Sequence, residues 1–168
     1  CQALGAVKNP TTSAQCWSFY PAKILGCKGD GGALTTNNLS VYDYVKNARH
    51  HFKEDNRAFG GNYRLDNLQA ALLNVKIRHI DEILEKRKEI AEQYLEAFKT
   101  YEGNPRNDVP RVWQDFVWNA GEKRDELHSY LGASEVETMK NEYPFTTKIA
   151  KLPKAAGYEA STLRLPCN

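Results

Sequence analysis

An apolar repeat at helical spacing runs through residues 65–98 and constrains the fold more than any other feature of the chain. This spacing places the apolar side chains on one face of a helix. We therefore predict one long amphipathic helix, or two helices that meet at a bend near Arg78. The apolar positions are Leu65, Leu68, Leu72, Val75, Ile80, Ile83, Leu84, Ile90, Ala91, Tyr94, Leu95 and Phe98.

Short strand-like segments lie on both sides of this helix. Upstream, residues 14–20 are apolar and aromatic, residues 33–36 follow a glycine-rich turn as a second strand, and residues 39–52 have helical spacing. Downstream, residues 112–118 alternate like a strand, and residues 162–165 form another. The pattern predicts an α/β class: part of an α/β domain, a long helix and a smaller α+β unit.

The loop at residues 103–107 contains glycine, proline and asparagine and marks a boundary. We expect residues 1–75 to be part of a large domain, residues 76–102 to form a connecting helix, and residues 103–168 to form a small, incomplete domain. The chain begins at Cys1 without a methionine and stops inside a strand-like segment. We expect it to be a piece of a longer polypeptide.

Composition excludes several classes of function. The 23 basic and 21 acidic residues give a net charge of +2, which is too even to indicate binding to nucleic acid or to a charged membrane surface. No apolar run is long enough for a membrane span and no export leader precedes the chain, so we expect a cytoplasmic protein. The 4 cysteines form no Cys-x-x-Cys pair and no zinc-site spacing with histidine, so we expect no metal site.

A lysine at the end of an apolar run is the first candidate for chemistry. Lys23 closes the segment Ser18-Phe19-Tyr20-Pro21-Ala22-Lys23, and Gly29-Asp30-Gly31-Gly32 follows. A poorly solvated lysine loses its proton and becomes a nucleophile that forms Schiff bases with carbonyl compounds. On position alone, however, a surface lysine and a plain hairpin turn are the more frequent cases.

Other catalytic motifs do not explain these residues. A Walker phosphate loop is absent, and Ser18 lies five positions before Lys23, so the β-lactamase Ser-x-x-Lys spacing is not met. His50 and His51 are adjacent and would point apart on a helix, which argues against a shared metal. No histidine lies near Ser18 and Asp30 in sequence, although a triad assembled in space stays open.

Several motifs in a fixed order resemble the DegT/DnrJ/EryC1/StrS family of pyridoxal-phosphate sugar aminotransferases, which have fold type I. The resemblance spans nearly the whole chain and is most specific over residues 1–98. The segments that carry it are Gln2-Ala3-Leu4-Gly5-Ala6, Ser18 to Lys23, Leu25-Gly26, Gly29 to Gly32, Gly61-Asn62-Tyr63-Arg64-Leu65-Asp66, Gln69-Ala70-Ala71, Arg87 to Tyr94 and Leu163 to Cys167.

The resemblance implies a role for each matching residue. Lys23 matches the lysine that forms the Schiff base with pyridoxal 5'-phosphate and moves the proton between cofactor and substrate. Ser18 matches a serine that hydrogen-bonds the cofactor phosphate, and Asn62 matches an asparagine that reaches this phosphate across a dimer interface. Arg64 lies beside it with a phosphate or interface role, and Gln2 matches a residue beside the cofactor ring.

The function implied is amino transfer from glutamate or glutamine to a nucleotide-linked keto-sugar, for amino-sugar and surface polysaccharide synthesis, by a homodimer. Ile24 stands where the family often has asparagine. The family's acidic partner of the pyridinium nitrogen falls upstream of Cys1, so we expect the chain alone to be inactive.

Three alternatives stay open. The first is a non-catalytic dimerisation or regulatory module, whose members would be expected to lose the lysine. The second is a sugar dehydratase, in which histidine replaces that lysine. The third is a structural domain without cofactor. Lys23 argues against the first two.

Overall fold

A computed structural model describes residues 13–53, 59–103, 105, 111–140 and 152–167. The chain forms two compact units, Cys1–Ile83 and Leu84–Asn168. The boundary between them falls within the helix α3 (Ile80–Ala97). Gln2 lies outside the described residues.

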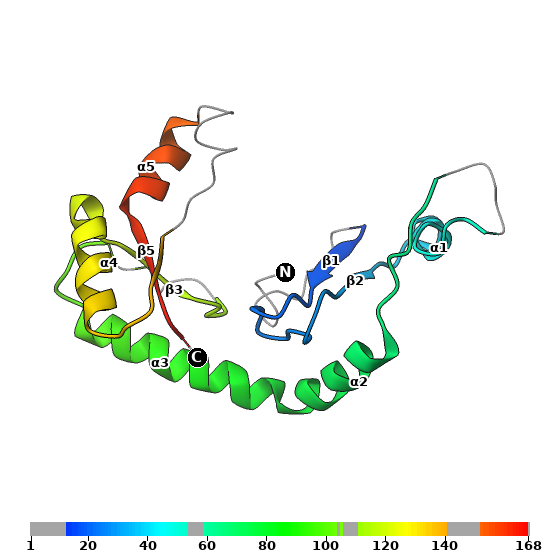
Figure 1. Ribbon diagram of the computed structural model, residues 1–168, viewed down its shortest axis with the longest axis horizontal. Helices are drawn as coiled ribbons and strands as arrows, with labels where there is room; N and C mark the ends of the chain where they lie inside the picture. The colour runs from blue at the N-terminus through cyan, green and yellow to red at the C-terminus, as the bar shows by residue number, and fades with distance from the viewer. Residues whose placement is uncertain (1–12, 54–58, 104, 106–110, 141–151, 168) are drawn as a thin grey trace. The chain divides into compact units, whose positions relative to one another are not determined.

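The first unit begins with a hairpin. Strand β1 (Gln15–Ser18) pairs antiparallel with β2 (Gly32–Thr35), and Ser18 lies opposite Gly32 (Figure 1). The glycine-rich turn between the strands therefore carries Lys23, as the sequence indicates. Strand β1 is shorter than the predicted segment 14–20, whereas β2 has the predicted length and begins one residue earlier than predicted.

Helix α1 (Leu39–Ala48) follows the hairpin. It begins after Asn38, whose side-chain oxygen accepts a hydrogen bond from the Val41 N–H at 3.3 Å and so caps the helix. The prediction that this helix continues to residue 52 is wrong. His51 and Phe52 have φ angles of 63° and 48°, and residues in the left-handed region cannot continue a right-handed helix.

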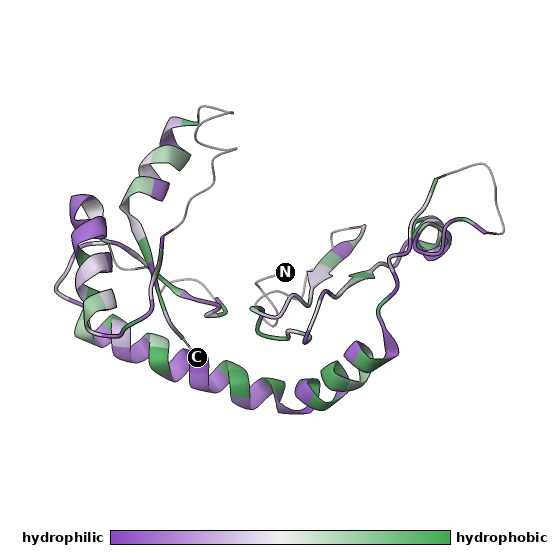
Figure 2. Ribbon diagram, in the orientation of Figure 1, coloured by the Kyte–Doolittle hydropathy of each residue, from purple (hydrophilic) through white to green (hydrophobic). Residues whose placement is uncertain are grey.

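The long apolar repeat forms two helices that meet at a bend. Helix α2 (Asn67–Lys76) leads through the short 3₁₀ turn η1 (Ile77–His79) into α3. The predicted bend near Arg78 is thus confirmed. Hydrophobic and hydrophilic residues alternate around both helices, as the repeat requires (Figure 2).

The core of the first unit connects the turn after β1 to α2. Its buried side chains are Leu25, Cys27 and Leu73, and Phe19 and Leu65 pack against them. Leu25 and Cys27 come from the glycine-rich turn and Leu73 from α2. The apolar face of α2 therefore holds the turn that carries Lys23.

The second unit is a small antiparallel sheet with helices. The central strand is β5, which pairs with β3 and with β4 (Figure 1). Burial on β5 is nearly continuous, as expected for a strand with neighbours on both sides. The elements are β3 (Phe116–Asn119), η2 (Gly121–Lys123), α4 (Arg124–Ala133), β4 (Met139–Lys140), α5 (Pro153–Ser161) and β5 (Thr162–Leu165).

The strand predicted over residues 112–118 forms only at its end. The Nη1 of Arg87 donates hydrogen bonds to the carbonyls of Trp113 and Gln114 at 3.2 and 2.9 Å. The Arg87 side chain from α3 thus hydrogen-bonds to backbone oxygens that would otherwise pair with a neighbouring strand. The core beside it contains Phe116 and Leu163, both fully buried.

Large apolar side chains on α1 and α2 remain exposed. Leu39 is 72% exposed on α1, and Leu68 and Val75 are 70% and 58% exposed on α2. Within the described part of the chain, no helix has the length and apolarity needed to cross a membrane. No group of three or more metal-binding side chains occurs among the same residues.

Candidate active site

Lys23 lies in a tight turn directly after β1. Its backbone N–H donates to the carbonyl of Tyr20 at 2.8 Å, and its side chain is half-buried. The next two residues, Ile24 and Leu25, are only 3% and 6% exposed. Burial of this apolar pair fixes the backbone on one side of Lys23, while Ala22 on the other side stays exposed.

Gly26 makes this turn possible. A Cβ atom at Gly26 would lie 2.5 Å from the carbonyl oxygen of Pro21 and 2.7 Å from that of Tyr20. Both are backbone atoms, which cannot swing aside as a flexible side chain can. Only glycine therefore allows the chain to return so close to the segment that carries Lys23.

Helix α2 holds the turn through polar contacts as well as through the core. The Gln69 Oε1 accepts a hydrogen bond from the Lys28 N–H at 2.9 Å. The Lys76 Nζ donates to the carbonyl of Gly26 at 3.4 Å. Sequence spacing does not show that Gln69 and Lys76 hold this turn, because each is far from its partner in sequence. Gln69 is 41 residues from Lys28, and Lys76 is 50 residues from Gly26.

The Ser18 side chain and the Lys23 backbone both hydrogen-bond to Tyr20. The Tyr20 N–H donates to the Ser18 Oγ at 3.3 Å, and the Tyr20 carbonyl accepts from the Lys23 N–H. Because the Ser18 oxygen accepts this bond, its own O–H remains a donor for a ligand. The structure therefore links Ser18, the last residue of β1, to Lys23 in the following turn through Tyr20.

Asn62 and Arg64 form a separate group with His50. His50 and Asn62 make an isolated antiparallel bridge. The Arg64 Nε lies 2.8 Å from the Asn62 Oδ1, and the Arg64 Nη1 lies 3.2 Å from the His50 Nδ1. Since a guanidinium only donates, the Asn62 oxygen and an unprotonated His50 Nδ1 must face it. The NH₂ group of Asn62 is therefore turned away from Arg64.

Burial lowers the pKa of His50, and the nearby charges of Lys53 and Arg64, with His51 and Arg49, lower it further. The imidazole is therefore neutral at pH 7. Because its Nδ1 accepts from Arg64, its proton resides on Nε2. Sequence reasoning considered His50 only as a metal ligand. The signal that could have identified it is the concentration of basic residues around it.

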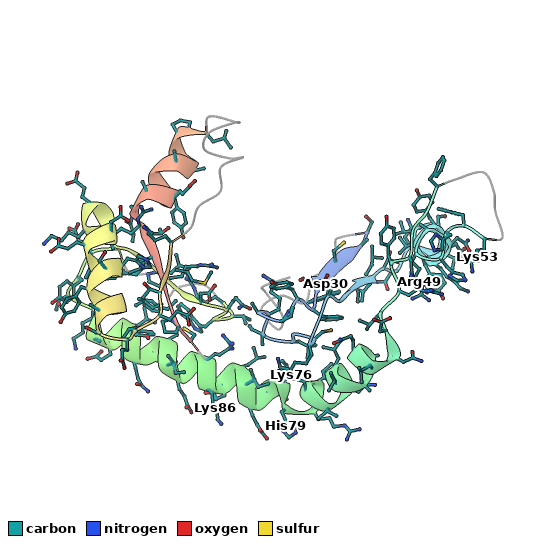
Figure 3. All side chains as sticks on the ribbon, viewed as in Figure 1. Asp30, Arg49, Lys53, Lys76, His79 and Lys86 are labelled. Carbon is teal, nitrogen blue, oxygen red and sulfur yellow. The ribbon has the colours of Figure 1, made fainter. Side chains whose placement is uncertain are left out.

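A cavity of about 930 Å³ joins the hairpin to the Asn62 segment. Ser18 and Lys23 do not line it, so the described residues do not place the Lys23 turn and Asn62 around one cavity. Asp30, just before β2, and Arg49, directly after α1, both line it (Figure 3). Its lining comprises Trp17, Asp30, Gly31, Gly32, Ala33, Leu34, Tyr42, Val45, Lys46, Ala48, Arg49, Asn62, Tyr63, Arg64 and Leu65.

The available donors suit the phosphate of pyridoxal phosphate. A phosphate needs several hydrogen-bond donors and positive charge. Ser18 offers an O–H, Asn62 offers its outward NH₂, and Arg64 adds a cation beside it. Lys23 offers the amine that such a cofactor requires. The chemistry of these residues fits the group, and Asn62 and Arg64 line a cavity that Ser18 and Lys23 do not line.

Comparisons with known proteins identify the family to which the chain belongs. The model of the DegT/DnrJ/EryC1/StrS aminotransferase family matches residues 1–166. The dTDP-3-amino-3,4,6-trideoxy-alpha-D-glucose transaminase of Streptomyces venezuelae is 31% identical over 173 residues, which cover 92% of this chain and 45% of that protein. The chain thus spans about half the length of this relative.

Solved structures support the same assignment. A DegT/DnrJ/EryC1/StrS aminotransferase from Brucella abortus superimposes with a TM-score of 0.81 at 31% identity and covers 92% of this chain and 45% of its own. NtdA from Bacillus subtilis, solved with the cofactor PMP, shares the fold with a TM-score of 0.83 at 21% identity, over 99% of this chain and 44% of its own. The expected fold class, part of a fold-type-I transferase, is confirmed. The chain belongs to the DegT/DnrJ/EryC1/StrS aminotransferase family, whose members depend on pyridoxal phosphate.

Proposed function

We propose that the complete protein is a cytoplasmic aminotransferase that moves an amino group from glutamate or glutamine to a nucleotide-linked keto-sugar. One observation carries this proposal: the Ser18 side chain and the Lys23 backbone both hydrogen-bond to Tyr20, and the turn that follows buries its apolar side and leaves the lysine half-exposed. This arrangement suits covalent attachment of pyridoxal phosphate. The sugar transaminase relatives indicate the class of substrate.

Each residue has a stated part in this reaction. When bound, pyridoxal phosphate supplies an electron sink and carries the amino group between the two substrates. Lys23 attaches the cofactor and then accepts and returns a proton at its Nζ. The Ser18 O–H and the Asn62 NH₂ donate to the phosphate. Arg64 orients Asn62 and supplies positive charge.

A second copy of the chain completes the site in this proposal. Asn62 and Arg64 share a cavity that Ser18 and Lys23 do not line, so Asn62 would serve the partner's cofactor. The exposed apolar side chains of α1 and α2 suit an interface between copies, because such side chains are costly to leave in water. The division at residues 1–75, 76–102 and 103–168 into large domain, connecting helix and small domain belongs to the same proposal.

Absorbance spectroscopy on the complete protein tests the function. Added pyridoxal phosphate should give the visible band of a lysine-bound cofactor, and Lys23→Ala should abolish it. Lys28→Ala is the matched control, because Lys28 is exposed and its hydrogen bond to Gln69 comes from the backbone, which the substitution keeps. A folded complete protein without the band, or a band that survives Lys23→Ala, would refute the proposal and favour a non-catalytic module.

Amino transfer itself is the second readout. The complete protein with glutamate or glutamine should convert a nucleotide-linked keto-sugar, and residues 1–168 alone should not. The expected inactivity follows from the resemblance, which places the acidic partner of the cofactor nitrogen before Cys1.

A further inference from the structure

Three side chains of α2 contact the glycine-rich turn that carries Lys23. Gln69, Leu73 and Lys76 are spaced four and three residues apart, which places them on one face of the helix. Leu73 is only 7% exposed, and Gln69 and Lys76 are half-buried before and after it along the helix. Figure 3 shows Lys76 on the side of α2 that lies toward the hairpin. This face of α2 therefore supports the turn from one side.

The Gln69 amide contacts two successive residues of the turn. Its Oε1 accepts the hydrogen bond from the Lys28 N–H at 2.9 Å. Its Nε2 lies so close to Gly29 that a Cβ atom there would be 3.1 Å away, so the missing side chain leaves room for the amide. An apolar contact allows two surfaces to slide, whereas a hydrogen bond has a preferred direction. Gln69 therefore fixes where the turn lies on α2.

Lys76 contacts the turn at a second point, three residues after Lys23. Its Nζ donates to the Gly26 carbonyl at 3.4 Å, in a partly buried contact. Burial raises the pKa of the Cys27 thiol, and the charge of Lys76 acts in the opposite direction. Helix α2 thus holds the turn at Gly26 and at Lys28, on both sides of the buried Cys27.

These contacts extend to Lys23 because the backbone of the turn is cross-linked. The Cys27 N–H donates to the Phe19 carbonyl at 2.7 Å, and the Lys23 N–H donates to the Tyr20 carbonyl at 2.8 Å. Gly26 packs so closely against the Tyr20 carbonyl oxygen that a Cβ atom would lie 2.7 Å from it. A shift of the turn relative to α2 would therefore move Lys23 as well.

We propose that Gln69 is a positioning residue, which sets the place of the Lys23 amine by holding the glycine-rich turn on α2. The inference rests on the proposed function, in which Lys23 attaches the cofactor and moves a proton at its Nζ. Such chemistry is sensitive to geometry, since a misplacement of about 1 Å can cost a hundredfold in rate. Gln69 does not line the cavity beside the hairpin, so its replacement should lower kcat and leave KM unchanged.

Kinetics of the complete protein, loaded with pyridoxal phosphate, test this role. Gln69→Met keeps the reach of the side chain and removes the oxygen that accepts from Lys28. The value of kcat per lysine-bound cofactor should fall roughly tenfold, while KM for each substrate changes by less than about twofold. Unfolded molecules do not affect this value, because they carry no lysine-bound cofactor. Asn74→Met is the control, since Asn74 is an exposed amide on another face of α2.

Rescue by a conservative variant identifies the oxygen as the cause. Gln69→Glu keeps an acceptor at the same reach and should retain the kcat of the unmodified protein. Hydrogen exchange on the cofactor-free complete protein gives a readout that needs no activity. The Lys28 amide loses its acceptor in Gln69→Met and should exchange roughly ten times faster, whereas Gln69→Glu and Asn74→Met should leave its exchange unchanged.

The outcomes separate positioning from simple support of the fold. Unchanged kcat in Gln69→Met overturns the proposal, even where the Lys28 amide exchanges faster, because the turn is then loosened without effect on Lys23. Equal kcat in Gln69→Met and Gln69→Glu, both below that of the unmodified protein, also overturns it. Absence of the lysine-bound cofactor band in the unmodified protein is instead a failure of the proposed function. Hydrogen exchange distinguishes the two failures, because it reports on Gln69 without cofactor.

Discussion

Arg64 fixes the orientation of the Asn62 side chain, because its Nε donates to the Asn62 Oδ1 at 2.8 Å. The amide NH₂ must then face outward, where a phosphate can accept from it. Without Arg64 the amide could rotate and would spend part of its time with the oxygen toward the phosphate.

Replacement of Arg64 by methionine should therefore weaken binding of pyridoxal phosphate to the complete protein. We expect roughly tenfold weaker binding, which corresponds to about 1.4 kcal/mol and to the loss of one charge-assisted hydrogen bond. A titration followed by cofactor absorbance measures it. Arg78→Met is the control, since Arg78 is an exposed arginine in the same unit. Equal affinities for both variants would show that Arg64 does not position Asn62.

Gly26 should not tolerate a side chain. In Gly26→Ala the new methyl group would lie 2.5 Å from the Pro21 carbonyl oxygen, so the turn must open and displace Lys23. We expect a loss of about 1–3 kcal/mol in the free energy of unfolding and loss of the lysine-bound cofactor band. Chemical denaturation and absorbance report the two effects. Gly132→Ala, which has open space around it, should change neither.

At Phe52, replacement by glycine should destabilise the protein no more than replacement by alanine, which is the opposite of the usual order. It is buried, packs edge-on against Tyr44 with ring centres 5.3 Å apart, and has a φ angle of 48°. Loss of the ring should destabilise the protein by about 3 kcal/mol or more. Glycine is normally the worse replacement by about 0.5–1 kcal/mol, but here it relieves the left-handed backbone that alanine retains. Phe52→Gly should thus unfold at the same or a higher urea concentration than Phe52→Ala. A lower midpoint for the glycine variant would contradict a strained backbone at this position.

The cysteines should differ sharply in reactivity. Cys16 is exposed, whereas Cys27 and Cys167 are buried. Burial raises the pKa of Cys27, and it raises the pKa of Cys167 to about 11, although Arg87 acts in the opposite direction. At pH 8 this leaves on the order of one thiolate in a thousand at Cys167. Among these three described cysteines, iodoacetamide followed by peptide mapping should label Cys16 before Cys27 and Cys167, and early labelling of Cys167 would contradict its burial.

The sequence predicts the helices of the first unit well because their cause is local. The apolar repeat at residues 65–98 sets the faces of α2 and α3, and even the bend near Arg78 appears as a change in that repeat. The end of α1 is different. Spacing alone continues the helix to Phe52, whereas the structure ends it at Ala48 because the next turn takes up left-handed backbone.

The candidate site is only partly visible in sequence. The motif places Ser18 and Lys23 near each other because they lie within six residues, and the structure links both to Tyr20. The role of His50 depends on its contact with Arg64, which lies 14 residues further along the chain. A pairwise contact of this kind leaves no periodic pattern, so spacing rules do not detect it.

The support of the Lys23 turn by α2 affects how variants of this protein should be interpreted. Gln69 and Lys76 touch no proposed ligand, yet each holds a backbone group of the glycine-rich turn. In a saturation screen for activity, substitutions at these two positions would therefore score like active-site lesions. A map of functional residues drawn from such a screen would extend along one side of α2 and overstate the true footprint of the bound ligands.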